Sequence, residues 1–263
     1  MSDLSADFVV ADAIVRSAGN ASWLEPVWPV HAKVRVASTL RTGGVSRAPH
    51  ASLNVATHVG DDPRAVDENR RRLVAALALP GEPFWLDQVH GARVVEARAG
   101  RPTRPAADAS FTRLAGQVCV VATADCLPVV LADERGGCVA IAHAGWRGLA
   151  GGVVEATLEA LGGEPARLVA WLGPAISARA FEVGAEVREA FVARHGDDVA
   201  AFAVNARGRY QADLYALARL TLRRCGVERV HGGGLCTYTD ERDFFSFRRD
   251  GQTGRMVTLA WLA

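Results

Sequence analysis

The amino-acid sequence predicts a single α/β domain in which layered, mixed β-sheets form a sandwich with flanking helices. Short apolar runs rich in valine and isoleucine, typical of buried strands, share the chain with amphipathic segments that end in helix caps. The two kinds of segment do not alternate strictly, as a Rossmann or TIM-barrel topology requires. Two of the strand-like runs also lie too close together for a helical crossover, so part of the sheet should be antiparallel.

Four segments carry the apolar period and the end signals of helices. In the first, Asp62 is a typical N-cap, Pro63 occupies the first helical position, and Pro80 with Gly81 ends the segment. The other three cover about residues 151–161, 184–195 and 211–225. Each is followed directly by glycine, which readily takes the left-handed conformation at a helix C-terminus. These segments are the expected flanking helices.

Four short apolar runs predict strands, at residues 118–122, 138–142, 168–172 and 256–262. The segment D-E-R-G-G at 133–137 has the composition of a hairpin turn and would join the first two runs. If residues 118–124 pair with 138–144, Cys126 and His143 stand at the ends of neighbouring strands. Pairing or the adjoining loops would then bring these two side chains together.

Composition places the chain among ordinary globular proteins. It has 263 residues, of which 49% are hydrophobic and 22% charged, and these values exclude a disordered or fibrous protein. The 30 lysines and arginines nearly balance the 29 aspartates and glutamates, which leaves a formal net charge of +1. Proteins that bind nucleic acid through its phosphates usually have a clear basic excess. We therefore expect no nucleic-acid partner.

Targeting signals and cysteine usage predict the compartment. No basic segment followed by a long apolar stretch opens the chain, so no secretory signal is expected. No apolar run reaches the about 18 residues that predict a transmembrane helix. The five cysteines, an odd number without a C-x-x-C pair, are typical of reduced thiols. We expect a cytoplasmic protein with no membrane partner, in which a loosely structured N-terminal extension at 1–26 precedes a catalytic domain at 27–263.

Three segments are too polar and too rich in glycine to be plain core: W-L-D-Q-V-H-G (85–91), T-A-D-C-L-P (123–128) and H-A-G-W-R-G (143–148). Cys126 stands where a strand leaves the sheet, and a nearby histidine or cation can turn such a thiol into a nucleophile or metal ligand. By contrast, Cys119 and Cys138 lie inside apolar runs and are expected to be inert. His143 opens a glycine-rich turn into a helix, and the N-terminus of such a helix can bind anions.

Together, His90, Cys126 and His143 supply two imidazoles and one thiol. This set fits a zinc site with an open fourth position, typical of catalytic zinc, in which the ion would activate water. It fits a Cys-His nucleophile pair equally well. The spacings of 36 and 17 residues match no short zinc-finger pattern, so the sequence leaves both alternatives open.

Further motifs follow in order along the chain: W-L-G-P-A-I, F-E-V-G-A-E-V, C-T-Y-T and, near the end, F-F-S-F-R-R-D-G-Q-T-G-R. With the three segments above, they closely resemble the YfiH family over about residues 27–263. Members of that family are labelled polyphenol oxidase, laccase domain or purine nucleoside phosphorylase. The chain departs from the family pattern at Leu40, where threonine is frequent, and at Phe247, where tyrosine is usual.

The resemblance implies a single α/β domain, related in fold to Cys-His deamidase toxins, in which His90, Cys126 and His143 meet in a pocket that holds zinc. It implies small-molecule substrates: phosphorolysis of adenosine, inosine, guanosine and methylthioadenosine by phosphate, and hydrolytic deamination of adenosine. In such a site we expect Asp125 to orient a ligand or move a proton. We expect Arg41 or Arg147 to hold phosphate.

Other functions stay open. One is a cysteine hydrolase or amidase acting on a peptidoglycan precursor or a related small molecule, with Cys126 as nucleophile and His143 as base. Another is a non-catalytic binder of metal or nucleotide. A four-copper laccase is disfavoured, because such enzymes need about ten histidines, largely in H-x-H pairs, and this chain has seven and no such pair. The resemblance makes zinc the expected cofactor, and a single copper ion is the less favoured one.

Overall fold

The computed structural model describes residues 9–10, 12–98 and 104–263. Within this part of the chain the strands form three sheets, of seven, six and three strands. The seven-stranded sheet has the order β1 (Val9–Val10), β2 (Ala13–Ala18), β3 (Ala21–Pro26), β4 (Val34–Thr39), β16 (Met256–Leu262), β8 (Val118–Thr123) and β5 (Pro83–Phe84). The six-stranded sheet has the order β15 (Arg229–Gly232), β11 (Leu168–Leu172), β9 (Leu127–Asp133), β10 (Val139–Ala144), β7 (Ala109–Thr112) and β6 (Val94–Glu96). The small sheet has the order β12 (Glu182–Val183), β14 (Tyr210–Ala212) and β13 (Phe202–Val204).

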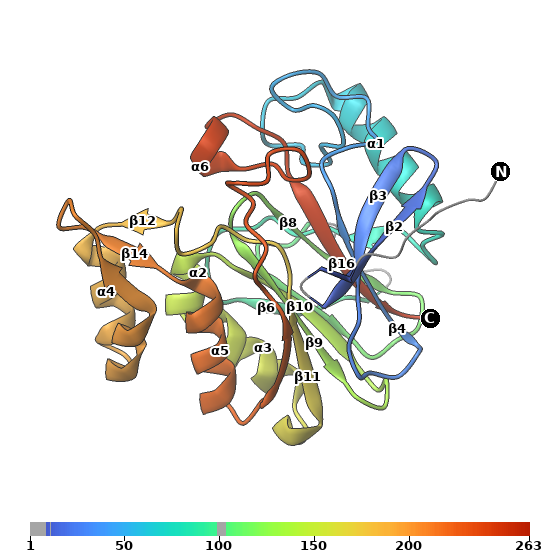
Figure 1. The fold of residues 1–263 in the computed structure, drawn as a ribbon. Helices are drawn as coiled ribbons and strands as arrows, with labels where there is room; N and C mark the ends of the chain where they lie inside the picture. The colour runs from blue at the N-terminus through green and yellow to red at the C-terminus, as the bar shows by residue number, and fades with distance from the viewer. Residues whose placement is uncertain (1–8, 11, 99–103) are drawn as a thin grey trace.

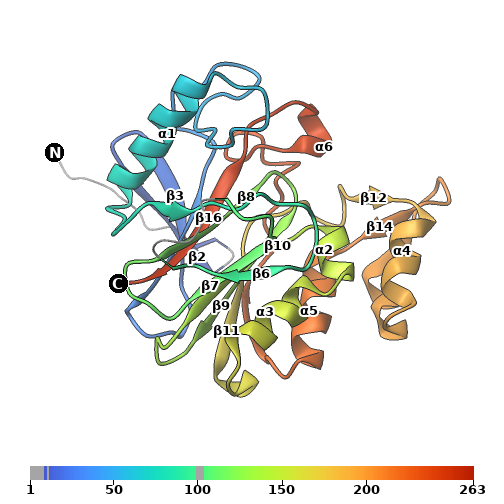
Figure 2. The ribbon, with the colours of Figure 1, turned by 180° about the vertical axis from the view of Figure 1, so that it is seen from behind.

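Helices lie around the two large sheets. They are α1 (Pro63–Ala76), α2 (Trp146–Ala150), α3 (Val153–Leu161), α4 (Ala185–Val192), α5 (Leu214–Arg224) and α6 (Phe247–Asp250), with 3-10 turns at Pro165–Arg167 and Gly196–Ala201. Helices α3 and α5 lie beside β9, β10 and β11, while α4 and the small sheet extend to one side of the molecule (Figure 1). Helix α1 lies at the opposite end from α3 and α5 (Figure 2). Among the described residues, no helix has the length and apolar character needed to cross a membrane.

Alternating side chains on the strands explain how the layers pack. In β9, Leu127, Val129 and Leu131 pack in the cluster formed with the helices. The intervening Val130 and Ala132 pack in the cluster between the two large sheets. Strand β8 continues the pattern, because Cys119 and Val121 also face the cluster between the sheets, while Val118 and Val120 pack with Leu73 of α1. Successive residues of a strand point to opposite faces, so central strands such as β8 and β9 are buried on both sides. The result is the predicted α/β sandwich of mixed sheets with flanking helices.

Aspartate side chains cap the N-termini of two helices. The Asp62 side chain caps α1 by accepting the N–H of Arg64, and Asp213 caps α5 by accepting the N–H of Ala216. Strands β11 and β16 have the predicted bounds. The predicted helix at 211–225 begins later, at Leu214, because residues 210–212 form β14 and pair with β12 and β13.

The predicted hairpin joins different strands from those expected. Residues 133–137 connect β9 to β10, which pair in antiparallel register with Pro128 opposite His143. Strand β8, the expected partner of residues 138–144, belongs to the other large sheet, where it pairs with β16 and β5. The prediction missed β9, a central strand that begins two residues before the apolar run V-V-L-A.

The expectation that residues 1–26 are loosely structured is wrong for residues 13–26. These residues form the antiparallel hairpin of β2 and β3, with Ala13 opposite Pro26. Strand β3 pairs with β4 through Trp23 and Leu24, and Leu24 is buried in the cluster between the sheets. Residues 1–8 and 11 lie outside the described residues.

Candidate metal centre

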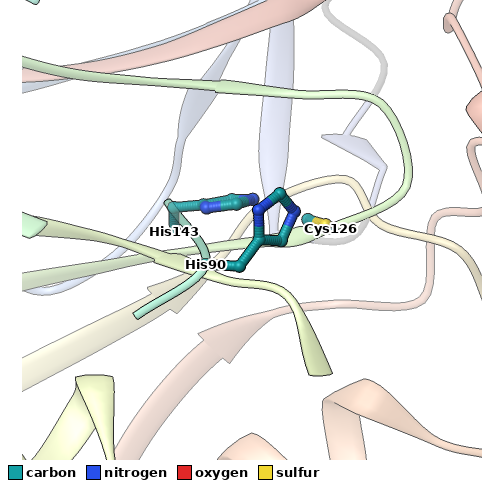
Figure 3. Close-up of side chains that lie close together, drawn as sticks. All are labelled: His90, Cys126 and His143. Carbon is teal, nitrogen blue, oxygen red and sulfur yellow. The ribbon is translucent and has the colours of Figure 1, made fainter. Parts of the chain in front are cut away.

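Three predicted residues meet at one end of the β9–β10 hairpin. His143 lies in β10, Cys126 directly precedes β9, and His90 lies in the loop between β5 and β6. One ligand atom from each residue can be chosen so that all three lie within 4.8 Å of one another. The two imidazole rings stand edge to face, with centroids 4.8 Å apart and planes at 74°. Figure 3 shows the three side chains pointing toward one another.

The register of the hairpin brings Cys126 and His143 together. Ala144 pairs with Leu127 and His143 with Pro128, so the residue before Leu127 lies next to the end of β10. The two side chains were expected to meet through pairing of 118–124 with 138–144, and they meet instead because β9 pairs with β10. The sequence therefore identified the correct pair of residues through an incorrect pair of strands.

Asp108, a residue that the sequence analysis did not single out, holds both histidines. Its buried carboxylate accepts backbone N–H groups from Val89 at 3.2 Å, His90 at 2.9 Å and Gly91 at 2.7 Å. It also lies 2.8 Å from Nδ1 of His143. One carboxylate thus fixes the turn that carries His90, which has a positive φ of 59°, and orients the His143 ring. A lone aspartate in the small-residue run A-A-D-A-S was the available signal.

Gly145 lies so close to the cluster that a side chain at this position would collide with it. A Cβ atom at Gly145 would lie 2.8 Å from Sγ of Cys126 and 3.4 Å from Cδ2 of His90. Real Cβ atoms do not approach sulfur so closely, so any larger residue would displace the thiol or the ring. This close approach explains the first glycine in H-A-G-W-R-G.

Electrostatics favours the charged forms of both Cys126 and His143. Burial opposes ionisation of the thiol, but the charge and hydrogen bond of His143, with those of His90, outweigh it and lower the pKa of Cys126 to about 6. Burial likewise opposes protonation of His143, but the Cys126 thiolate and Asp108 raise the pKa of His143 to about 9. At neutral pH the metal-free pair is therefore a thiolate beside an imidazolium, and a thiolate is the form that binds metals.

The donor set fits a zinc ion. Two imidazoles and one thiolate are zinc ligands, and three protein ligands leave the fourth tetrahedral position open. Asp108 occupies Nδ1 of His143, which leaves Nε2 for a metal, and this carboxylate–histidine arrangement is typical of zinc sites. Within the described residues this is the one cluster of at least three His, Cys, Asp or Glu side chains close enough to hold an ion.

Two chambers adjoin the cluster, and His90, Ala124, Cys126 and Phe247 line both. One chamber, of about 220 Å³, is also lined by His58, Gln88, His143 and Arg255. We call it the Arg255 chamber. The other, of about 270 Å³, is also lined by Asp125, Trp146, Arg147, Ile176, Phe181 and Arg248. We call it the Trp146 chamber.

Two other predicted site residues, Asp125 and Arg147, line the Trp146 chamber. The Asp125 carboxylate is buried and accepts the hydroxyl of Thr237 at 2.6 Å and the N–H of Arg248 at 2.7 Å, so it fixes the segment that carries α6. Arg147 is exposed at the edge of the Trp146 chamber, with its guanidinium 4.4 Å from the centroid of the Trp146 ring.

Arg41 is not among the residues that line either chamber. Its guanidinium donates hydrogen bonds to the carbonyl oxygens of Ala51 and Glu241 and lies 4.7 Å from the centroid of the Phe245 ring. These contacts tie the turn at residue 41 to two other segments. The chamber residues His58 and Arg255 were not singled out from the sequence, because they lie far apart in the chain and outside the three polar segments. Gln88 lies in the first of those segments, but its role in the chamber was not predicted either.

The fold and this cluster define a single-domain α/β protein with a candidate mononuclear His-Cys-His metal centre beside a two-chambered pocket. The chain belongs to the family described as multi-copper polyphenol oxidoreductase laccase, whose model matches residues 35–263.

Relatives with similar sequences carry another name. The chain is 55% identical over 242 residues to purine nucleoside phosphorylase PA4543 of Pseudomonas aeruginosa, covering 92% of this chain and 98% of that protein. It is 50% identical over 237 residues to purine nucleoside phosphorylase YfiH of Escherichia coli, covering 90% and 97%. These names confirm the resemblance to the YfiH family.

Solved structures share the fold. A Neisseria meningitidis protein, NMB0706, matches with a TM-score of 0.88 at 48% identity, over 91% of this chain and 98% of that one. A Bacillus licheniformis protein described as hypothetical protein YfiH matches with a TM-score of 0.85 at 29% identity, over 94% and 97%. The single-domain sheet sandwich is therefore the fold of this family.

Proposed function

We propose that the protein is a zinc-dependent purine nucleoside phosphorylase that also deaminates adenosine. The observation that carries the proposal is the His90–Cys126–His143 cluster at the junction of two chambers, in a chain 55% identical to a protein named purine nucleoside phosphorylase. The substrates are purine nucleosides, namely adenosine, inosine, guanosine and methylthioadenosine, together with phosphate. The protein acts in the cytoplasm, where thiols stay reduced, and its five cysteines are free.

In this proposal His90, Cys126 and His143 hold the zinc ion. Zinc supplies a Lewis acid to the reacting group when it is bound. Asp108 keeps the His143 ring in the orientation that presents Nε2, and Gly145 has no side chain that would displace Cys126 or His90. A site whose ligands are held in this way needs little rearrangement to bind its ion or its substrate.

Aromatic side chains provide a place for the purine. Trp146, Phe181 and Phe247 line the Trp146 chamber, and flat π-systems stack on such rings. Arg147 and Arg248 lie over the rings of Trp146 and Phe181, and both arginines also line this chamber. We assign Arg147 to substrate binding here. Asp125 positions the wall of the chamber through Thr237 and the backbone of Arg248.

Product analysis tests this function. The purified protein is incubated with adenosine, with and without phosphate, and products are separated by chromatography. Adenine with ribose 1-phosphate, formed only with phosphate, indicates phosphorolysis, and inosine indicates deamination. Cys126→Ala should lose both activities, whereas Cys225→Ala, a thiol outside both chambers, should keep them. If the wild-type protein forms neither product, the proposal is contradicted.

The thiolate–imidazolium pair favours a second candidate, a cysteine hydrolase or amidase acting on a peptidoglycan precursor or a related small molecule. Cys126 has a lowered pKa beside a histidine oriented by a carboxylate, the arrangement of an activated nucleophile. Chelation separates the two candidates. A zinc enzyme loses its activity when the metal is removed. A cysteine hydrolase keeps its activity after chelation and loses it when Cys126 is alkylated. Ligand or metal binding without any turnover would favour a non-catalytic binder.

A further inference from the structure

The Arg255 chamber has the charge of an anion site. Its polar lining consists of His58, Gln88, Thr123, Arg255 and the cluster residues, with no aspartate or glutamate among them. Its volume of about 220 Å³ is several times the ~30 Å³ of a water molecule, so an ion of the size of phosphate fits. The Trp146 chamber, in contrast, contains Asp125 and most of the aromatic rings.

Arg255 is a partly buried cation without a carboxylate partner. Its Nη1 donates to the carbonyl oxygens of Thr253 and Gly254, both at 3.0 Å, and its guanidinium lies 5.8 Å from the centroid of the Phe247 ring. Within the described residues, no aspartate or glutamate forms an ion pair with it. Burial lowers the pKa of Arg255, and the charges of Cys126 and Asp125 offset this effect only in part. An anion in the chamber would therefore stabilise the guanidinium, whose planar fork matches the oxygens of phosphate.

Arginine side chains around His58 make the electrostatic potential at this end of the Arg255 chamber positive. Burial lowers the pKa of His58, and the charges of Arg255, Arg104 and Arg70 lower it further, against a smaller opposing effect of Asp87. A neutral imidazole at this place still offers one N–H donor to an anion. Gln88 is not available for this role, because its side chain is paired with the backbone of Ala122 through two hydrogen bonds.

We propose that the Arg255 chamber binds the phosphate co-substrate, with Arg255 as the principal contact and His58 as a second donor, while the purine occupies the Trp146 chamber. The assignment rests on the proposed function. Since His90 and Cys126 line both chambers, the two substrates meet at the cluster. A phosphate oxygen forms the bond to ribose C1′, and the C1′–N9 bond breaks with its electron pair going to the purine. The proton of hydrogen phosphate ends on the purine, which balances the reaction.

The test compares variants of the two chambers in the zinc-loaded protein. Arg255→Gln should raise the KM for phosphate at least about tenfold more than the KM for adenosine, the loss expected from one charge-assisted contact. His58→Gln should raise the phosphate KM by a smaller factor, about threefold. Arg242→Gln, a surface arginine paired with Asp243, is the matched control and should behave as the wild type. Arg255→Lys, which keeps the charge, should recover part of the phosphate affinity.

A second readout does not depend on turnover. Calorimetric titration of the protein with inorganic phosphate alone should give binding in the wild type and in Arg242→Gln, and much weaker binding in Arg255→Gln at equal zinc content and thermal stability. A wild-type phosphate affinity in Arg255→Gln, or a selective phosphate defect in Arg147→Gln instead, would overturn the assignment. Absence of phosphorolysis by the wild type would instead count against the proposed function, and the titration would still decide whether the chamber binds phosphate.

Discussion

The carboxylate of Asp108 lies 2.8 Å from Nδ1 of His143 and 2.9 Å from the backbone nitrogen of His90, and thereby connects two candidate metal ligands that are 53 residues apart. A carboxylate that orients a ligating histidine usually affects metal affinity and activity by about 10- to 100-fold. A buried carboxylate that is not one of the three candidate ligands therefore fixes two of them.

Replacement of this carboxylate is the first prediction. Asp108→Asn keeps the shape but removes the charge that holds His143 and the three backbone N–H groups, so zinc affinity should fall by about 10- to 100-fold. Zinc affinity is measured by competition with a chromophoric chelator. Asp67→Asn, an exposed carboxylate on α1, is the matched control and should leave the affinity unchanged. An unchanged affinity in Asp108→Asn would remove Asp108 from this role.

The second prediction concerns pH. The pKa of Cys126 is lowered to about 6, and a thiol is an acid, so the reactive thiolate persists as the pH falls from 9 until about pH 6. In metal-free protein, alkylation of Cys126 should stay fast at pH 7 and slow below about pH 6, as peptide mass spectrometry can follow. Buried Cys119, whose pKa is raised to about 12, should not react. His143→Ala should move the Cys126 profile to higher pH, and an unmoved profile would refute the pairing.

The third prediction tests the space at the cluster. Gly145→Ala places a methyl group 2.8 Å from Sγ of Cys126, so the thiol or the His90 ring must move and zinc occupancy should drop at least about tenfold. The control is Gly196→Ala, where an added methyl group meets nothing within 4 Å. Metal analysis of the purified variants gives the readout. Full zinc occupancy in Gly145→Ala would show that the cluster tolerates the added atom.

The fourth prediction tests the corrected role of the N-terminal hairpin. Leu24 in β3 is buried between the two large sheets, so Leu24→Ala should lower the free energy of unfolding by about 2–4 kcal/mol. Val27, just beyond β3, is 48% exposed, and Val27→Ala should cost less than about 1 kcal/mol. Chemical denaturation of both variants measures the difference. Equal effects would mean that the hairpin adds nothing to the core.

Periodic and capped elements of this fold were predictable, and those defined by distant contacts were not. Strands β11 and β16 are uninterrupted apolar runs, and α1 has both an aspartate cap and Pro63. Strand β9 was missed because Pro128, its second residue, argues against a central strand, yet this strand lies between β10 and β11. Strand β2 was not predicted because several of its residues are exposed and it lacks a continuous buried apolar run, although it pairs with β3 along its whole length.

In the candidate site, too, residues in local motifs were predictable and residues placed by distant contacts were not. His90, Cys126 and His143 stand in local motifs whose residue types carry their own chemistry, and the structure brings them together. Asp108 is a lone buried carboxylate outside the quoted motifs. Arg255 ends the motif F-F-S-F-R-R-D-G-Q-T-G-R, but nothing in that motif indicates the chamber that Arg255 lines. Arg41 lies in a basic turn, but its contacts are carbonyl oxygens and an aromatic ring. Sequence alone does not say what surrounds a guanidinium.

The dependence of nucleoside turnover on zinc is the sharpest test of the proposed function. Metal-stripped protein is titrated with zinc while the formation of adenine and ribose 1-phosphate from adenosine and phosphate is followed. We expect no turnover without metal and a linear rise that ends at one zinc ion per chain, with no such rise in Cys126→Ala. Full turnover in the metal-free wild type, or no product at any zinc content, would contradict it.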